Sequence, residues 1–411
     1  QKKAAGFTNG IAAVIAVPGS GKTLVMMERI GNLVKQYNVQ PETIIGLTFN
    51  RNAAEQMRQR LVPVLGELAQ RVTLSTIHSW CHYLLRTEGR VFEIISGKEQ
   101  ISMIRNLMKR KRLDLSVGTI LSEISLAKNN LIGVEEFRAL YESDKTMIKV
   151  ANIYESYEKE KAKKYLLDFD DLLLETYFLL NNNDAVREKY AGRYHHILID
   201  EFQDTNPVQL EIIKLIVDTD NDHDKSYWIA GDDWQSIYSF AGASVNNILN
   251  FQSTFSSSTL FILNINYRST PQILKACQNL ISHNVRKIEK TLKTDNPGGD
   301  DVIVLESSSE EGEALCLVNE IHDLVGQRGY RYKDIAVLYR ANFQSRVVEE
   351  TFAQMKIPYY IENGLNFYQR SEVRYLLDYL RLINDPDSEE GDEALRSILN
   401  VPNRYISRKF I

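Results

Sequence analysis

The amino-acid sequence predicts an α/β protein whose parallel sheets are covered by helices on both faces. Short apolar runs rich in β-branched residues alternate along the chain with segments of helical spacing. Near-continuous apolar runs are typical of strands that are buried on both faces of a parallel sheet. The 411 residues also exceed what one compact core usually holds, so we expect two or three domains.

Two series of apolar runs predict two α/β units. The first series predicts strands at 11–17, 43–49, 72–75, 196–200 and 227–231. The second series begins at 260–267 and continues at 301–307 and 334–340. Because strands that alternate with helices form parallel sheets, each series predicts one sheet.

The stretch 88–190 lies between two strands of the first series and has only helical patterns. Helical spacing is followed by Ile101, Ile104, Leu107 and Met108, and again by Val150, Ile153, Tyr154 and Tyr157. We therefore expect a helical insertion in the first α/β domain. The acidic, turn-rich stretch 384–393 predicts a linker.

Composition excludes several classes of protein. The apolar runs are far shorter than the ~20 residues that span a bilayer, so no membrane partner is expected. Three scattered cysteines form no CxxC pair, which favours a reducing compartment and gives no indication of zinc. The net charge of −5 argues against a globally basic DNA-coating protein, although it allows a local basic channel. The chain opens at Gln1 without a methionine, so we expect residues upstream.

The segment "AVPGSGKT" at 16–23 predicts a phosphate-binding loop, because it follows an apolar strand and precedes a helical pattern. Glycines in such a loop let successive backbone N–H groups approach an anion at a helix N-terminus. Lys22 is expected to neutralise the β- and γ-phosphates, and the Thr23 hydroxyl to ligate Mg²⁺. The expected nucleotide-binding residues here are Ala16, Gly19, Ser20, Gly21, Lys22 and Thr23.

A second acidic segment, "ILIDEFQDT" at 197–205, complements this loop. Asp200 and Glu201 end an apolar strand, which places two carboxylates at one sheet edge. Asp200 is expected to hold Mg²⁺, and Glu201 to orient and deprotonate the attacking water. Together the two segments predict a Mg²⁺-dependent nucleoside triphosphatase.

An ordered series of motifs resembles the UvrD/Rep/PcrA group of superfamily 1 (1A) DNA helicases, from Gln1 to about residue 405. The matching segments are "TFNRNAAEQM" (48–57), "STIHSW" (75–80), "DFDDLL" (168–173), "DEFQDT" (200–205), "GDDWQSIYSFAGA" (231–243), "NYRS" (266–269) and "AVLYRANFQSRVVEE" (336–350).

The resemblance implies tandem RecA-like domains with ATP in the cleft between them and single-stranded DNA across both. Domain 1A would comprise 1–88 and 191–261, with the helical insertion 1B at 89–190. Residues 262–390 would be the first part of domain 2A, and 391–411 the start of the 2B insertion.

The resemblance also implies further roles at the nucleotide. Gln1 matches the adenine-reading glutamine, Tyr267 would stack on adenine, and Arg268 would act as an arginine finger on the γ-phosphate. Gln235 would contact the attacking water and the γ-phosphate, and would therefore distinguish ATP from ADP.

Aromatic residues of the same motifs are the expected DNA contacts. Tyr238 and Phe240 offer rings on which bases can stack, although the same rings could also fill the domain interface. By resemblance, Phe49 matches a base pocket, His78 lies near the DNA backbone, and Phe169 stacks near the strand. The expected partners are single-stranded DNA and its junctions with duplex.

The sequence departs from the family pattern in three places. Ala241 stands where the family has arginine, and Trp234 replaces an acid. Two downstream motifs of domain 2A, one carrying a second ATP-contacting arginine, do not occur before Ile411. We therefore expect a fragment with an incomplete domain 2A, whose ATP hydrolysis by itself is weak or absent.

Three functions remain open at this point. The leading interpretation is a DNA-associated, cytoplasmic single-stranded DNA translocase and 3′–5′ helicase that hydrolyses ATP with Mg²⁺. The alternatives are the motor subunit of a helicase–nuclease complex and an ATP-gated DNA-binding module with little turnover. Nothing in the sequence distinguishes repair from replication, or identifies protein partners or oligomeric state.

Overall fold

The computed structural model describes residues 1–411 except 112–114, 218–224, 240–241, 363–370, 403 and 407–411. Its contacts divide the chain into two units, 1–302 and 303–411, and each unit is described by itself. No helix in the described part of the chain is both long and apolar enough to cross a membrane.

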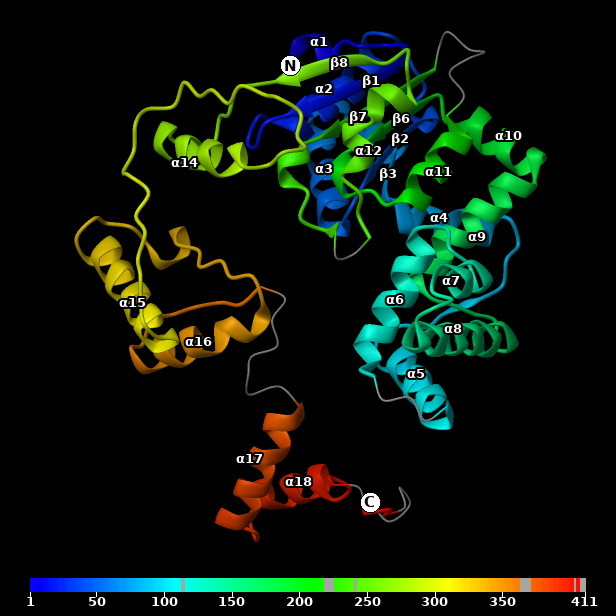
Figure 1. Ribbon diagram of the computed structural model, residues 1–411. Coiled ribbons are helices and arrows are strands. Elements are labelled where there is room, and N and C mark those ends of the chain that lie inside the picture. The colour runs from blue at the N-terminus through cyan, green and yellow to red at the C-terminus, as the bar shows by residue number, and fades with distance from the viewer. Residues whose placement is uncertain (112–114, 218–224, 240–241, 363–370, 403, 407–411) are drawn as a thin grey trace. The chain divides into compact units, whose positions relative to one another are not determined.

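The first unit is built on a six-stranded, wholly parallel sheet with the order β3-β2-β6-β7-β1-β8 (Figure 1). The five strands expected for the first series are confirmed. The strands are β1 (Gly10–Ala16), β2 (Ile44–Thr48), β3 (Thr73–Thr76), β6 (His196–Ile199), β7 (Ser226–Gly231) and β8 (Thr259–Leu263). Most positions of the central strands are buried on both faces, as the apolar runs predicted.

The sixth strand corrects one expectation. The run 260–267 was predicted to open a second sheet, but β8 pairs in parallel with β1, with Val14 opposite Phe261. The apolar run of β8 does not indicate which strand it pairs with, because the neighbours of a strand in a parallel sheet can be far away in the sequence. β8 therefore completes the first sheet.

The two faces of the sheet bury different helices. Odd-numbered side chains of β1, such as Ala13, pack with α4 (Ile77–Thr87), α9 (Phe169–Asn182), α10 (Asp184–Arg193) and α11 (Pro207–Ile216). Even-numbered ones, such as Val14, pack with α1 (Lys2–Ala5), α2 (Lys22–Lys35) and α3 (Arg51–Leu65). This alternation follows from the two-residue period of a strand, and it gives the covered parallel sheet that was predicted.

The stretch between β3 and β6 is almost entirely helical, as expected. After α4 it contains α5 (Gly97–Lys111), α6 (Val117–Asn129), α7 (Val134–Leu140) and α8 (Lys145–Lys163), followed by α9 and α10. The one addition is a two-residue parallel pairing of β4 (Glu93–Ile94) with β5 (Leu166–Leu167). The predicted helical positions form a separate core, except Ile101, which is exposed.

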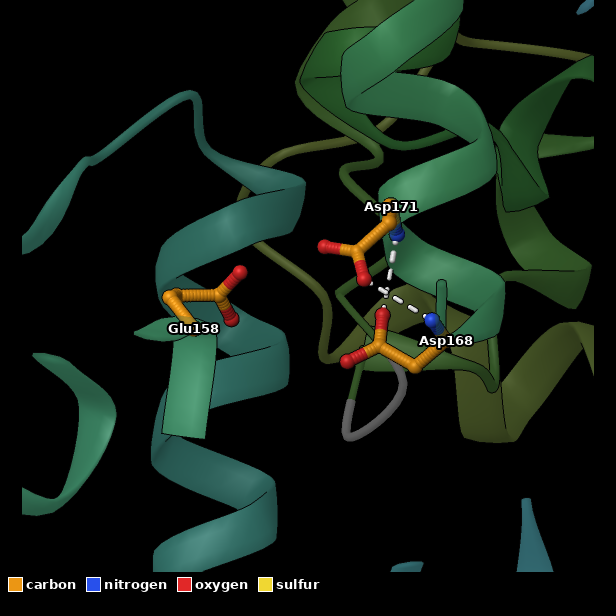
Figure 2. Close-up of side chains that lie close together, drawn as sticks. All are labelled: Glu158, Asp168 and Asp171. Atoms are coloured by element: carbon orange, nitrogen blue, oxygen red, sulfur yellow. Dashed lines mark hydrogen bonds between the residues drawn. The ribbon is translucent and has the colours of Figure 1, made fainter. Parts of the chain in front are cut away.

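A buried cluster of charges holds α6, α8 and α9 together. The carboxylates of Glu158, Asp168 and Asp171 approach within 4.8 Å of one another (Figure 2). Lys128 Nζ lies 2.8 Å from Asp168 and 2.6 Å from Asp171, and Lys161 Nζ lies 3.0 Å from Asp168. Both ammonium groups also contact Glu158. The lysines thus supply the positive charge that a cation would bring, so we assign a salt-bridge cluster rather than a metal site.

The first unit also contains α12 (Asn246–Leu249) and α13 (Phe251–Thr254) between β7 and β8, and α14 (Pro271–Ser282) after β8. The second unit contains α15 (Glu310–Gly326), α16 (Ser345–Gln354), α17 (Ser371–Asn384) and α18 (Glu389–Ile398). α15 and α16 share a small apolar core around Val318, Ile321 and Phe352.

Two expectations for the second unit were wrong. Residues 301–307 and 334–340 form no strand, and exposed side chains such as Val304 and Leu338 show that neither run has a neighbouring strand among the described residues. The expected linker 384–393 is too long: residues 385–388 join α17 to α18, whereas 389–393 are helical, because Ser388 caps α18 and Glu389 and Glu390 favour its positive N-terminal end.

We predict that Lys128→Met lowers the free energy of unfolding by about 3–5 kcal/mol, because it leaves three carboxylates, two of them buried, with Lys161 as their one remaining cationic partner in the cluster. The matched control is Lys163→Met. Lys163 pairs with Glu160 on the surface, and exposed pairs contribute about 0–1 kcal/mol. Urea denaturation of the variants measures both free energies of unfolding. Equal losses of stability in the two variants would contradict the conclusion that the charge cluster holds α6, α8 and α9 together.

Candidate functional site

The phosphate-binding loop joins β1 to α2 and has the backbone that its glycines predict. Gly19 and Gly21 have φ values of +66° and +83°. Residues that carry a Cβ rarely adopt this backbone conformation. A Cβ on Gly19 would lie 2.7 Å from Asn266 Nδ2. Ser20 is buried, and its Oγ has no hydrogen-bond partner among the described residues. The loop therefore offers a free hydroxyl beside the N-terminus of a fourteen-residue helix, which fits a phosphate.

The two acidic residues expected to serve the nucleotide lie against this loop. Lys22 Nζ donates to Glu201 Oε2 at 2.5 Å, and Thr23 Oγ1 donates to Asp200 Oδ2 at 3.0 Å. Burial and the negative charge of Glu201 raise the pKa of Asp200 to about 6. A hydroxyl and a carboxylate oxygen at this spacing are ligands of the kind Mg²⁺ prefers, so the residues fit the ion.

Glu201 reaches Lys22 through an uncommon backbone conformation. Its φ of 51° and ψ of 46° place it in the left-handed region, which costs a non-glycine residue about 1–2 kcal/mol. The turn that follows is anchored by Asp204, whose N–H donates to the Glu201 carbonyl at 2.9 Å. The strain thus coincides with the residue that forms an ion pair with the loop lysine.

Gln203 connects the acidic segment to the segment 231–239. Its Nε2 donates to Glu201 Oε2 at 2.8 Å, and its Oε1 accepts from the backbone N–H of Asp232 at 2.9 Å. Asp232 Oδ2 in turn accepts from Gln235 Nε2 at 2.7 Å. An amide carries a donor and an acceptor at its two ends, so it can join two partners of opposite kind.

Sequence reasoning quoted Gln203 within "DEFQDT" but gave it no role. Its importance depends on Asp232, which is far away in the sequence. The hydrogen-bonded path Lys22–Glu201–Gln203–Asp232–Gln235 is therefore a finding of the structure. We call this path the relay.

The residues expected to hold the nucleotide from its other side also meet the loop. Gln1 Nε2 donates to the Ser20 carbonyl at 2.8 Å. Asn266 Nδ2 donates to the Pro18 carbonyl at 2.6 Å, and the N–H of Tyr267 donates to the Gly19 carbonyl at 3.0 Å. Asn266 is a second residue whose role was missed.

The side chains next to Asn266 remain accessible. Tyr267 is 55% exposed, and Arg268 is exposed as well. The Asn266 side-chain oxygen accepts from the Arg268 N–H at 2.8 Å, which fixes the backbone from which this arginine projects. Ala16, the last residue of β1, is fully buried, and its carbonyl accepts from Lys290 Nζ at 3.3 Å.

The structure brings together two of the aromatic residues expected to contact DNA. Phe49 and Tyr238 meet, with ring centroids 4.7 Å apart and planes tilted by 38°. Phe169 lies on the first turn of α9 and is 47% exposed. Phe240 and Ala241 lie outside the described residues.

His78, expected near the DNA backbone, lies next to the two acidic residues of the nucleotide site. It lines a narrow cavity of about 10 Å³ with Phe49, Asp200 and Glu201. Burial lowers the pKa of His78 to about 4, so the imidazole is neutral at physiological pH. A neutral ring cannot attract a DNA phosphate by charge, although it can still donate a hydrogen bond.

Comparison with known proteins gives matches along nearly the whole chain. Residues 1–256 match the UvrD/REP helicase N-terminal domain, and residues 261–411 match the UvrD-like helicase C-terminal domain. The chain is similar to the ATP-dependent DNA helicase PcrA of Bacillus subtilis, with 35% identity over 415 residues that cover 99% of this chain and 55% of that protein.

Staphylococcal relatives give the same picture. PcrA of Staphylococcus epidermidis is 36% identical over 416 residues, and PcrA of Staphylococcus aureus is 35% identical over 419 residues. Each match covers 99% of this chain and 56% of the relative. The chain thus spans about half the length of these curated relatives.

We predict that Asp204→Asn changes how stability depends on pH. Burial and the charge of Glu201 raise the pKa of Asp204 to about 7, against ~4 in an unfolded chain. The folded wild type therefore loses stability as the pH rises from about 4 to about 7, and the variant lacks this loss.

Thermal or urea unfolding at pH 4.5 and pH 8 measures the effect. Relative to wild type, Asp204→Asn should have a larger free energy of unfolding, and so be more stable, at pH 8 than at pH 4.5. Glu67→Gln, at an exposed position, is the control. A relative stability of Asp204→Asn that is the same at both pH values would contradict the prediction.

Proposed function

Because this chain belongs to the UvrD/REP helicase family, we propose that the protein is an ATP-driven translocase on single-stranded DNA. By this proposal it unwinds duplexes in the 3′ to 5′ direction and hydrolyses ATP with Mg²⁺. The observation that carries the proposal is the relay, which runs from the loop lysine Lys22 to Gln235. Tyr238, three residues further on, contacts Phe49. One short segment thus carries both a group for the phosphate and a ring for a base.

At the nucleotide, Lys22 would leave Glu201 and bind the β- and γ-phosphates. Both partners are already in place at 2.5 Å, so phosphate binding exchanges one ion pair for another and frees the Glu201 carboxylate. Glu201 would then orient and deprotonate the attacking water. Mg²⁺, held by Thr23 and Asp200, supplies charge stabilisation at the phosphates when it is bound.

Groups on both sides of the loop would complete the nucleotide site. Gln1 would read the adenine and Tyr267 would stack on it, while Arg268 would stabilise charge on the γ-phosphate. Their support is that the Asn266 side chain is bonded to Pro18 and the Tyr267 N–H to Gly19, while the side chains of Tyr267 and Arg268 stay exposed. Gln235 would contact the water and the γ-phosphate.

At the DNA, Phe49, Tyr238 and Phe240 would provide the stacking surface, and Phe169 a further ring. Stacking is worth about 1–3 kcal/mol per base and tolerates any sequence. His78 would act near the same strand by hydrogen bonding. We propose that the substrate is single-stranded DNA, including its junctions with duplex.

We also propose a division of the chain into RecA-like domain 1A (1–88 and 191–261), insertion 1B (89–190), the first part of 2A (262–390) and the start of 2B (391–411). Support comes from the helical stretch between β3 and β6. β8 ends at Leu263, two residues beyond the proposed end of domain 1A. ATP would bind between 1A and 2A.

The test measures ATP hydrolysis by the full-length gene product with and without single-stranded DNA. Wild type should be stimulated at least tenfold, and Lys22→Ala should lose activity because the phosphates lose their cation. Lys35→Ala, at the far end of the same helix, is the control. Stimulation below about twofold, which is only ~0.4 kcal/mol of coupling, would contradict the motor. ATP and DNA binding without turnover would instead indicate an ATP-gated binding module.

A further inference from the structure

A buried lysine outside the proposed nucleotide site contacts the relay. Lys290 lies between α14 and the end of the first unit, and its side chain is fully buried. Its Nζ lies 2.6 Å from Asp232 Oδ1, 2.6 Å from Asp233 Oδ1 and 3.3 Å from the carbonyl of Ala16. An ammonium group has three N–H donors, so these contacts use all of them.

The segment around Lys290 is fixed to residues 232–234 at several points. The N–H of Ile288 donates to Asp233 Oδ2 at 2.7 Å. The Trp234 ring lies 4.5 Å from Lys290 Nζ, and Trp234 packs with Val17, Leu274 and Leu292. The contacts reach the end of β1, α14 and the segment 231–235 together, so displacement of this lysine would disturb all three.

The charge of Lys290 determines what Asp232 can do. Asp232 and Asp233 are adjacent and buried, and two such carboxylates repel each other unless a cation lies between them. Burial raises the pKa of Asp232, and Lys290 opposes that rise. With Lys290 in place, Asp232 stays an acceptor for the Gln235 amide. Fixing the amide nitrogen of Gln235 also fixes the direction in which its carbonyl oxygen can accept a hydrogen bond.

We propose that Lys290 is a positioning residue for ATP hydrolysis, acting through Asp232 to hold Gln235. Lys290 belongs to the stretch 264–302, which also carries Arg268. It therefore connects Gln235, the proposed sensor of the γ-phosphate, to the segment that carries the proposed arginine finger. This inference rests on the proposed function, because it assigns a role within that hydrolysis. Lys290 itself contacts no nucleotide in this account.

The experiment uses the full-length gene product and DNA-stimulated ATP hydrolysis. Lys290→Met should lower kcat at least tenfold while the affinity for Mg²⁺–ADP, which lacks the γ-phosphate, stays within twofold of wild type. Lys287→Met is the matched control, because Lys287 lies on the same segment but contacts the backbone carbonyls of Ser282 and Asn284 and, at 3.7 Å, Glu289, none of which belongs to the relay. Its kcat should stay within twofold.

A double-mutant cycle separates positioning from general loss of structure. If Lys290 acts through Gln235, adding Lys290→Met to Gln235→Ala should lower kcat by less than a further twofold. Should Lys290→Met fail to bind ADP because it does not fold, Lys290→Gln, which keeps a donor, takes its place in the cycle.

The outcomes distinguish this inference from the proposed function. An active wild type with additive losses in the cycle, or with a Lys290→Met kcat equal to that of Lys287→Met, overturns the inference alone. A wild type without any ATP hydrolysis overturns the proposed function, and the inference with it.

Discussion

The ion pair between Lys22 and Glu201 is the interaction on which the rest of the site depends. It joins the phosphate-binding loop to the end of β6, where a non-glycine residue, Glu201, adopts a left-handed conformation. Without this turn, the Glu201 carboxylate would not face the loop, and Gln203 could not hold Glu201 and the Asp232 backbone at once. The local strain is offset by a set of hydrogen bonds that the turn makes possible.

The relay suggests how a nucleotide could affect a distant ring. A phosphate that takes Lys22 from Glu201 changes the charge next to Gln203, and Gln203 is bonded directly to the backbone that leads to Gln235 and Tyr238. Buried hydrogen bonds of this kind are sensitive to the loss of one partner, because the other is left unsatisfied. Lys290 restrains the same backbone from another direction. The segment that contains Asp232 is thus held by Gln203 and by Lys290, which a nucleotide could influence separately.

The sequence allowed accurate prediction wherever local pattern and chemistry agree. Strands β1, β2, β3, β6 and β7 followed from apolar runs, and the loop at 16–23 from glycine and lysine spacing. Prediction failed where partners are remote in sequence. β8 pairs with β1 rather than opening a new sheet, and 301–307 and 334–340 are not strands because strand formation needs a neighbour that no local pattern specifies. Gln203, Asn266 and Lys290 were missed for the same reason, since each acquires its role from a distant residue.

The most direct test of this account is the thermodynamic coupling between nucleotide and DNA. The affinity of single-stranded DNA should be measured with and without a non-hydrolysable ATP analogue, and the affinity of the analogue with and without DNA. In wild type each ligand should change the affinity of the other by the same factor, about fivefold or more. Gln203→Leu, which removes both amide contacts at similar volume, should bring that factor close to one. A coupling factor in Gln203→Leu equal to that of wild type would contradict the account.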